Sequence, residues 1–245
     1  MRQRGRLMAV RWAVSAAAAA LLGGCGTVQI APQPVFPKPL VEQVPATVGL
    51  VLPAEQRDYK HEETRGGVAW AVLLGAGQQT FARTVMGATF REVREFPDRA
   101  AAARDPALQA VFEPHIDEYS FATAAETGGE YVAVTIRYRI EVLAPDGSAH
   151  DTLSLTGYGT SLMGGMEMGQ SDSVDRATRA AMRDAAAKFL AQFGRLPMAA
   201  TLRAAEKLSG DAAQQRATAA ATVIEALPVR GSRRPTAPPV TRAAP

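Results

Sequence analysis

The one cysteine of this 245-residue chain, Cys25, is the residue whose chemistry can be read most directly. A single cysteine cannot form a disulfide within its own chain, and it cannot build a zinc site that needs several cysteines. It can serve as a catalytic nucleophile, as a buried filler or as the acceptor of a covalent modification. The residues that precede it favour the last of these.

Residues 1–24 have the layout of a secretory signal peptide. A basic start without acidic residues is followed by the apolar run Trp12–Leu22 and then by small residues. The basic residues are Arg2, Arg4, Arg6 and Arg11. The apolar run is shorter than the ~20 residues that span a bilayer. This order predicts a peptide that is removed on export.

The junction Leu22-Gly23-Gly24-Cys25 resembles the lipobox of bacterial lipoproteins, in which a small residue precedes the cysteine. The resemblance implies that Cys25 receives an S-linked diacylglycerol, that the chain is cut just before it, and that the freed amine is acylated with a fatty acid such as palmitate. Two alternatives stay open: an ordinary signal peptide that ends near a cysteine, and an N-terminal membrane anchor.

The residues after the cysteine bear on its destination. In enterobacterial lipoproteins an aspartate directly after the acylated cysteine favours retention in the inner membrane, and this chain has Gly26 and Thr27 there. We therefore expect a Gram-negative envelope protein anchored by lipid in the outer membrane, on its periplasmic side. Two or more acyl chains anchor a protein stably where one is marginal.

The other chemistry-bearing residues form no recognised catalytic or metal-binding motif. The sequence HEETR has Arg65 where HExxH has its second histidine, and GTSLM has Met163 where GxSxG has its second glycine. His115 could bind a metal with Asp117 and Glu118, but strand alternation sends Glu118 to the opposite face, which favours a solvated strand end. The three histidines are scattered along the sequence, at His61, His115 and His150. We expect no catalytic residue, no metal, no cofactor and no enzymatic activity.

Charge argues against a nucleic-acid partner. The chain has 27 basic and 24 acidic residues, and cleavage before Cys25 would leave 23 basic residues against the same 24. A nearly neutral protein outside the cytoplasm has no general attraction to nucleic acid. Residues 228–245 keep four arginines and no acidic residue, so this tail could touch an anionic envelope polymer or remain solvated.

Proline separates a folded part from two appendages. Residues 25–46 contain five prolines, which disfavour helix and central strand and predict an extended tether that holds the domain away from the bilayer. Residues 228–245 are rich in Pro, Ala and Arg without periodicity and are expected to be disordered. The periplasmic domain is therefore expected at residues 47–227.

Within the domain, apolar residues recur with both the strand and the helix period. Strands are expected at Thr47–Pro53, at residues 88–96 and, as an antiparallel meander with a PDG turn, at Val111–Gly159. A polar loop is expected around residues 59–67, and glycines 75 and 77 are expected to bring the next helix close to the sheet. Helices are expected at Val68–Met86, Val174–Phe193 (capped by Asp172 or Ser173) and Met198–Leu227. Together these elements predict an α+β fold, a two-layer α/β sandwich with a mainly antiparallel sheet covered by helices.

This order of elements resembles YajG-like lipoproteins and, more distantly, curli-secretion and transport-auxiliary envelope lipoproteins. The residues that carry the resemblance are VGLVLP, Phe90 with Val93, the PDG turn and the Ala/Phe stripe that ends at Phe193. It implies a non-enzymatic binding or assembly role in the envelope, with an unknown protein or polymer as partner. The alternative is a subunit of a secretion or transport complex, oligomeric and using the Gly/Met-rich segment 157–169 as an interface.

Overall fold

The structure, a computed structural model, describes residues 27–37, 39–163, 169–210 and 222–224. The signal peptide, Cys25 and the basic tail lie outside these residues, and so do residues 164–168 of the Gly/Met-rich segment. The predictions made for those parts stay predictions.

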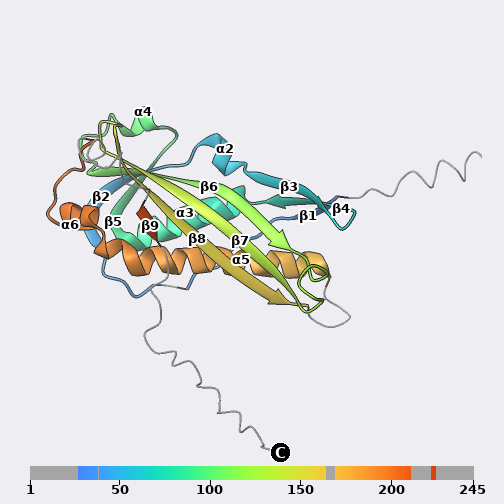
Figure 1. Cartoon of the computed structure of the whole chain (residues 1–245). Helices are drawn as coiled ribbons and strands as arrows, with labels where there is room; N and C mark the ends of the chain where they lie inside the picture. The colour runs from blue at the N-terminus through green and yellow to red at the C-terminus, as the bar shows by residue number, and fades with distance from the viewer. Residues whose placement is uncertain (1–26, 38, 164–168, 211–221, 225–245) are drawn as a thin grey trace, which may run out of the picture.

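A six-stranded sheet forms one layer of the molecule (Figure 1). Its strands, in spatial order, are β5 (Phe90–Phe96), β2 (Val44–Val51), β6 (Ala110–Ala122), β7 (Tyr131–Leu143), β8 (Ala149–Leu162) and β9 (Thr222–Ile224). Strands β6, β7 and β8 are antiparallel, which confirms the predicted meander, whereas β2 is parallel to both β5 and β6, and β9 is parallel to β8. The α+β class is thus confirmed, with a mixed sheet in place of the mainly antiparallel one expected.

A smaller sheet contains β1 (Val28–Ile30), β4 (Val68–Leu73) and β3 (Lys60–Arg65), in that order. Strands β3 and β4 form a hairpin that turns at Gly66 and Gly67, whose φ values of 56° and 78° suit glycine. The polar loop predicted here is therefore wrong from residue 60 onward. The helix predicted from residue 68 is also wrong in its first part, because pairing to β1 and β3 holds residues 68–73 extended and buries Trp70.

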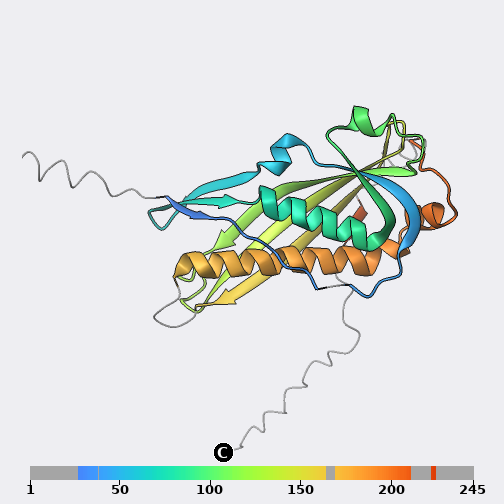
Figure 2. The same cartoon turned by 180° about the vertical axis from the view of Figure 1, so that it is seen from behind.

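Two helices cover one face of the large sheet, α3 (Gly75–Thr89) and α5 (Gln170–Gln192) (Figure 2). The predicted apolar stripe of α5 is buried, at Val174, Ala177, Ala181, Ala185, Phe189 and Phe193. A Cβ atom at Gly159 would lie 2.0 Å from the Ala177 carbonyl oxygen. The helix α5 can therefore approach β8 this closely only because the strand has a glycine at this position. The predicted cap is wrong, because the N-cap residue is Gly169 and Asp172 lies in the first turn.

The core lies between these layers. Strand β7 has the predicted alternation, with every second residue from Val132 to Val142 buried. Strand β6 buries both Ile116 and Tyr119, because a bulge between Ile116 and Glu118 inserts one residue and reverses the alternation. The inward-facing positions of β6 therefore differ on the two sides of the bulge.

The remaining helices are short: α2 (Ala54–Arg57), α4 (Arg99–Ala102), the 3₁₀ turn η1 (Phe193–Arg195) and α6 (Pro197–Arg203). The long helix predicted at Met198–Leu227 is wrong, since α6 ends at Arg203 and residues 222–224 form β9. Ala205 has a φ of 61°, a left-handed conformation that a helix cannot contain. The glycines of α3 also act differently from the prediction: a Cβ at Gly75 would lie 1.9 Å from the Arg57 carbonyl oxygen, so the close neighbour is the end of α2.

The proline-rich residues between β1 and β2, here called the strap (31–37 and 39–43), run along the two helices (Figure 2). Near the start of α3, a Cβ at Gly77 would lie 2.9 Å from the Pro32 carbonyl oxygen, and near its end Gln43 Nε2 donates to the Gly87 carbonyl at 2.8 Å. The ring of Phe36 lies 6.3 Å from that of Phe81. The backbone is extended as predicted, but from Val28 onward these residues pack on the domain and do not hold it at a distance.

Candidate functional site

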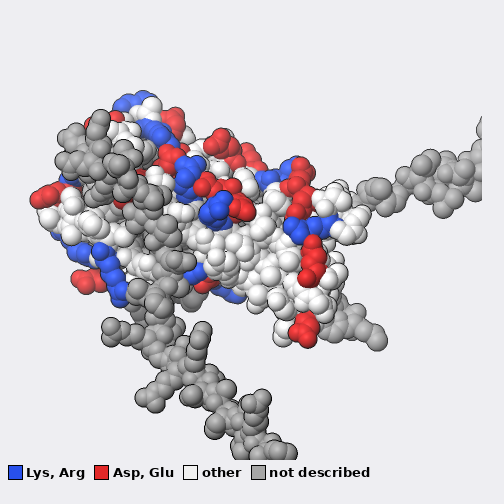
Figure 3. Space-filling view, in the orientation of Figure 1, with Lys and Arg blue, Asp and Glu red and all other residues white. Residues whose placement is uncertain are grey.

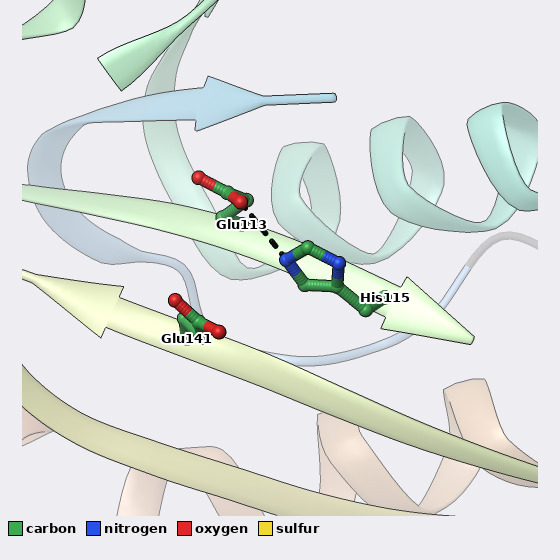
Figure 4. Close-up of side chains that lie close together, drawn as sticks. All are labelled: Glu113, His115 and Glu141. Carbon is green, nitrogen blue, oxygen red and sulfur yellow. Dashed lines mark hydrogen bonds and ion pairs between the residues drawn. The ribbon is translucent and has the colours of Figure 1, made fainter. Parts of the chain in front are cut away.

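The outer face of the large sheet, opposite α3 and α5, carries a cluster of ionisable side chains. Glu113 and His115 lie two residues apart on β6 and share a face, and Glu141 is directly opposite Glu113 on β7. One ligand atom from each of the three lies within 4.8 Å of the others (Figure 4). Glu113 and His115 are buried and Glu141 is half-buried. We call these three residues the carboxylate–histidine cluster.

Two arginines extend the cluster into a chain of alternating charges. Arg99 Nε donates to Glu113 Oε2 at 2.5 Å and Arg99 Nη2 to Glu113 Oε1 at 2.9 Å, and the same Nη2 also contacts Glu141. Arg139 pairs with Glu141 and donates to Asp117 Oδ1 at 2.9 Å. The charges therefore neutralise one another across β6, β7 and α4.

The electrostatics of Glu113 follow from this neighbourhood. Burial raises the pKa of its carboxyl, but hydrogen bonds from His115 and Arg99, together with their positive charge, outweigh burial and hold the pKa at about 2. The pKa of Arg99 is raised, mainly by its hydrogen bonds to Glu113. His115 Nε2 lies 2.9 Å from Glu113 Oε1. Both partners of the carboxylate thus stabilise its charged form.

The cluster fits a structural ion network better than a metal centre. Two carboxylates and an imidazole are suitable ligand types for a divalent cation. The guanidinium of Arg99, however, already contacts both carboxylates and occupies both oxygens of Glu113. Since a cation is supplied by the chain itself, a metal would have to displace this bidentate pair.

The sequence prediction for His115 is partly wrong. It lies buried against Glu113 and not at a solvated strand end, and its expected neighbours pair with arginines of β7. Asp117 pairs with Arg139, and Glu118 with Arg137. The prediction missed Glu113 and Glu141, although the spacing Glu-x-His within a strand places the first of them beside His115.

The other histidines lie in separate surroundings. The His61 ring on β3 is 5.0 Å from the Tyr119 ring. On the same strand, Arg65 pairs with Glu63 and Glu126. His150 Nδ1 lies 2.7 Å from the Ser209 carbonyl oxygen. The described part of the chain therefore joins neither of them to the carboxylate–histidine cluster.

A second feature is an apolar cavity of about 480 Å³ between the strap and α5. Phe36, Pro37 and Val41 line it from the strap, and Ala187 and Leu190 line it from the helix. Thr84, Arg183 and Asp184 also line it, but most of the lining is apolar and suits an apolar group.

Charged side chains are unevenly spread over the outer face. Figure 3 shows blue and red side chains gathered over one part of this face and a broad area without charge beside it. Strand β7 contributes outward charges at Arg137, Arg139 and Glu141. Outward residues of β8 are uncharged and include Ser154, Thr156, Tyr158 and Thr160. Among the described helices, none has the length and apolar character needed to cross a membrane.

Comparison with known proteins gives likenesses of fold only. No protein-family model matches the chain, and no curated protein matches its sequence. It is similar to a neuraminyllactose-binding hemagglutinin homolog from Helicobacter pylori, with 8% identity over 71% of this chain and 98% of that one and a TM-score of 0.45. It is also similar to PelC, a dodecamer from Paraburkholderia phytofirmans (18% identity, 61% and 95% covered, TM-score 0.28), and to the lipoprotein GNA1162 from Neisseria meningitidis (11%, 55% and 95%, 0.26). With every TM-score below 0.5, these likenesses carry no argument about function.

Proposed function

We propose that the chain is a lipid-anchored protein of the outer membrane, on its periplasmic side, with a non-enzymatic binding or assembly role in the cell envelope. The observation that carries the proposal is the lipobox-like junction at Cys25, followed after two residues by the first strand of a folded domain. A modified cysteine at that place would tie the domain to a bilayer without a spanning helix.

The chemistry of the outer face supports binding over catalysis. Each ionised group of the carboxylate–histidine cluster is matched by a charge of opposite sign, and His115 bonds a carboxylate and not a hydroxyl or thiol. A partner would be an envelope protein or polymer that meets the uncharged outward residues of β8.

A subunit role in an envelope secretion or transport complex is the second candidate. Leu162, at the end of β8 and within the Gly/Met-rich segment 157–169, is 73% exposed. An exposed leucine within such a segment suits contact with another subunit or with a membrane.

Metabolic labelling with a clickable fatty-acid analogue tests the anchor. The wild-type protein should be labelled and should begin at Cys25, whereas Cys25→Ser should remain unlabelled at the mass of the precursor. The double variant Cys25→Ser/Ser209→Cys, which carries its thiol at an exposed position 184 residues further along the chain, is the control and should also stay unlabelled. Label on Cys25→Ser would refute the lipoprotein assignment.

Separation of the two membranes on a sucrose gradient tests the destination. The labelled protein should band with the outer membrane. If it bands with the inner membrane, the sorting inference from Gly26 and Thr27 is wrong even though the anchor is present.

A further inference from the structure

The structure brings four segments together at one end of the molecule, and the surface that they form is here called the end face. They are the start of β1, the tip of the β3–β4 hairpin, the β6–β7 loop and the end of β8 (Figures 1 and 2). Val28 pairs with Trp70, Arg65 Nη1 donates to Glu126 at 2.8 Å, and Met163 N donates to the Glu130 carbonyl at 3.0 Å. These contacts link all four segments into one end face.

We infer that this end face lies directly on the phospholipid surface, so that the domain stands end-on on the membrane. The inference rests on the proposed function, because it takes Cys25 to be acylated. Its geometric basis is the short chain between the anchor and the fold: only Gly26 and Thr27 separate Cys25 from Val28.

The reach of that chain sets the distance. Three Cα–Cα steps span at most about 11 Å. The polar headgroup layer is about 5–7 Å thick on each side of the hydrocarbon core. Since the acyl chains of Cys25 must enter the core, Val28 lies at or just above the headgroups. The tip of the β3–β4 hairpin extends beyond Val28 toward the membrane, because β1 and β4 are parallel and Val28 pairs with Trp70 while β4 begins at Val68.

The side chains of the end face suit this position. Leu162 and Tyr131 pair across β7 and β8, and both are exposed, as is Val68 at the hairpin tip. Tyrosine is favoured at membrane interfaces, where its ring is apolar and its hydroxyl is wet. Arg65 is neutralised by Glu63 and Glu126, and Glu130 adds a negative charge, so attraction to anionic lipid is not the cause of contact.

A weak contact is sufficient here. The anchor makes contact between the end face and the bilayer an intramolecular event, for which a short linker gives a high effective concentration. The few exposed apolar side chains therefore need to set only the orientation. Contact should accordingly be insensitive to salt and to the fraction of anionic lipid.

The chain offers a direct test, because its single cysteine is consumed by the anchor. In the purified acylated protein, Leu162→Cys or Leu40→Cys supplies the one free thiol, to be labelled with an environment-sensitive nitrobenzoxadiazole dye. Leu40 is the matched control: it is fully exposed, and it lies on the strap about 25 Å from β1, near the far end of α3. Val68→Cys is a second probe of the end face should Leu162→Cys unfold.

The proteins are reconstituted in phosphatidylethanolamine/phosphatidylglycerol vesicles that contain lipid with a nitroxide on its headgroup. We expect the dye at residue 162 to be quenched at least twofold more than the dye at residue 40. Equal, weak quenching at both sites in protein that floats with the vesicles overturns the end-on arrangement alone. Strong quenching at both sites also overturns it, because the domain would then lie on its side. Protein that does not float with the vesicles overturns the anchor and this inference together.

Discussion

At the scale of single residues, Arg99 decides the character of the carboxylate–histidine cluster. A carboxylate as buried as Glu113 requires a counter-charge, since desolvation alone would favour its protonated form. The arginine supplies that charge from α4 with two parallel hydrogen bonds. The cluster therefore fastens α4 to β6 and β7.

The lowered pKa of Glu113 predicts a loss of stability in acid. Its pKa of about 2 in the folded protein lies below the ordinary value of 4.5, so its stabilising effect is complete above about pH 5 and disappears as the pH falls to 2. The effect is worth about 3 kcal/mol. Glu113→Gln should lower the free energy of unfolding at pH 7 by a similar amount and should flatten its pH dependence between pH 5 and 2.

Denaturant unfolding at a series of pH values measures this. Glu118→Gln on the same strand is the control, because Glu118 forms an exposed pair with Arg137 and exposed pairs contribute little. If Glu113→Gln and wild type lose stability in parallel as the pH falls, the carboxylate is not held in its charged form by these contacts.

At the scale of elements, helix α5 protects an open strand edge. Within the described residues, β9 pairs only with Leu153–Leu155 of β8, which leaves the following residues without a neighbouring strand. Asp184 accepts from the backbone N–H of Tyr158 at 2.8 Å, and Lys188 donates to the Thr156 carbonyl at 2.8 Å. The helix thus satisfies edge groups that could otherwise pair with another chain.

Removal of this cover should cause self-association. The double variant Asp184→Ala/Lys188→Ala should form dimers or larger species in proportion to its concentration, measured by analytical ultracentrifugation, because it exposes unpaired backbone groups. Asp175→Ala/Arg179→Ala removes the other i,i+4 ion pair of the same helix and should stay as wild type. Equal association of the two variants would assign the effect to charge alone.

The sequence predicted those elements whose pattern lies within one segment. The alternation of β7 and the apolar stripe of α5 each follow from a single buried face, and both are confirmed. The polar residues of β3 carry no such pattern, and the strand forms because β4 is there to pair with it. The sequence of β4 fits helix as well as strand by apolar spacing, and its partners on both sides decide the outcome.

The cluster was predictable only where its residues share a strand. Glu113 and His115 are neighbours on one face by alternation, so their contact could have been inferred. Arg99 and Glu141 come from other elements, and the register that places Glu141 opposite Glu113 is set by the whole meander. The bulge after Ile116 adds one residue to β6 without a distinctive sequence signal, and it places Glu118 on the outer face, where it pairs with Arg137.

At the scale of the whole molecule, the strap and β1 belong to the fold. They bury Ile30, Pro32 and Pro34 and connect the small sheet to the start of β2. The boundary expected at residue 47 cuts through β2, whose residues Val44 and Ala46 are buried as well.

Truncation tests this boundary. A chain that begins at Thr27 should unfold cooperatively, one that begins at Val44 should be less stable by several kcal/mol, and one that begins at Thr47 should be less stable again, because each fully buried aliphatic side chain contributes ~1.5–3 kcal/mol. Chemical denaturation of all three measures the order. Identical denaturation midpoints for the first two chains would show that β1 and the strap do not contribute to the stability of the domain.

The parallel pairing of β1 with β4 has a consequence for biogenesis. On the proposed function, the chain would be exported N-terminus first and would present β1 before its partner, which follows about 40 residues later, so closure of this loop must wait. A lipid attached at Cys25 would meanwhile be joined to the folding domain by a long unstructured segment. Once β1 pairs with the completed hairpin, only two residues separate the acylated cysteine from the fold. Folding itself would therefore draw the domain down to the bilayer, and a misfolded copy would hang away from it, within reach of periplasmic proteases.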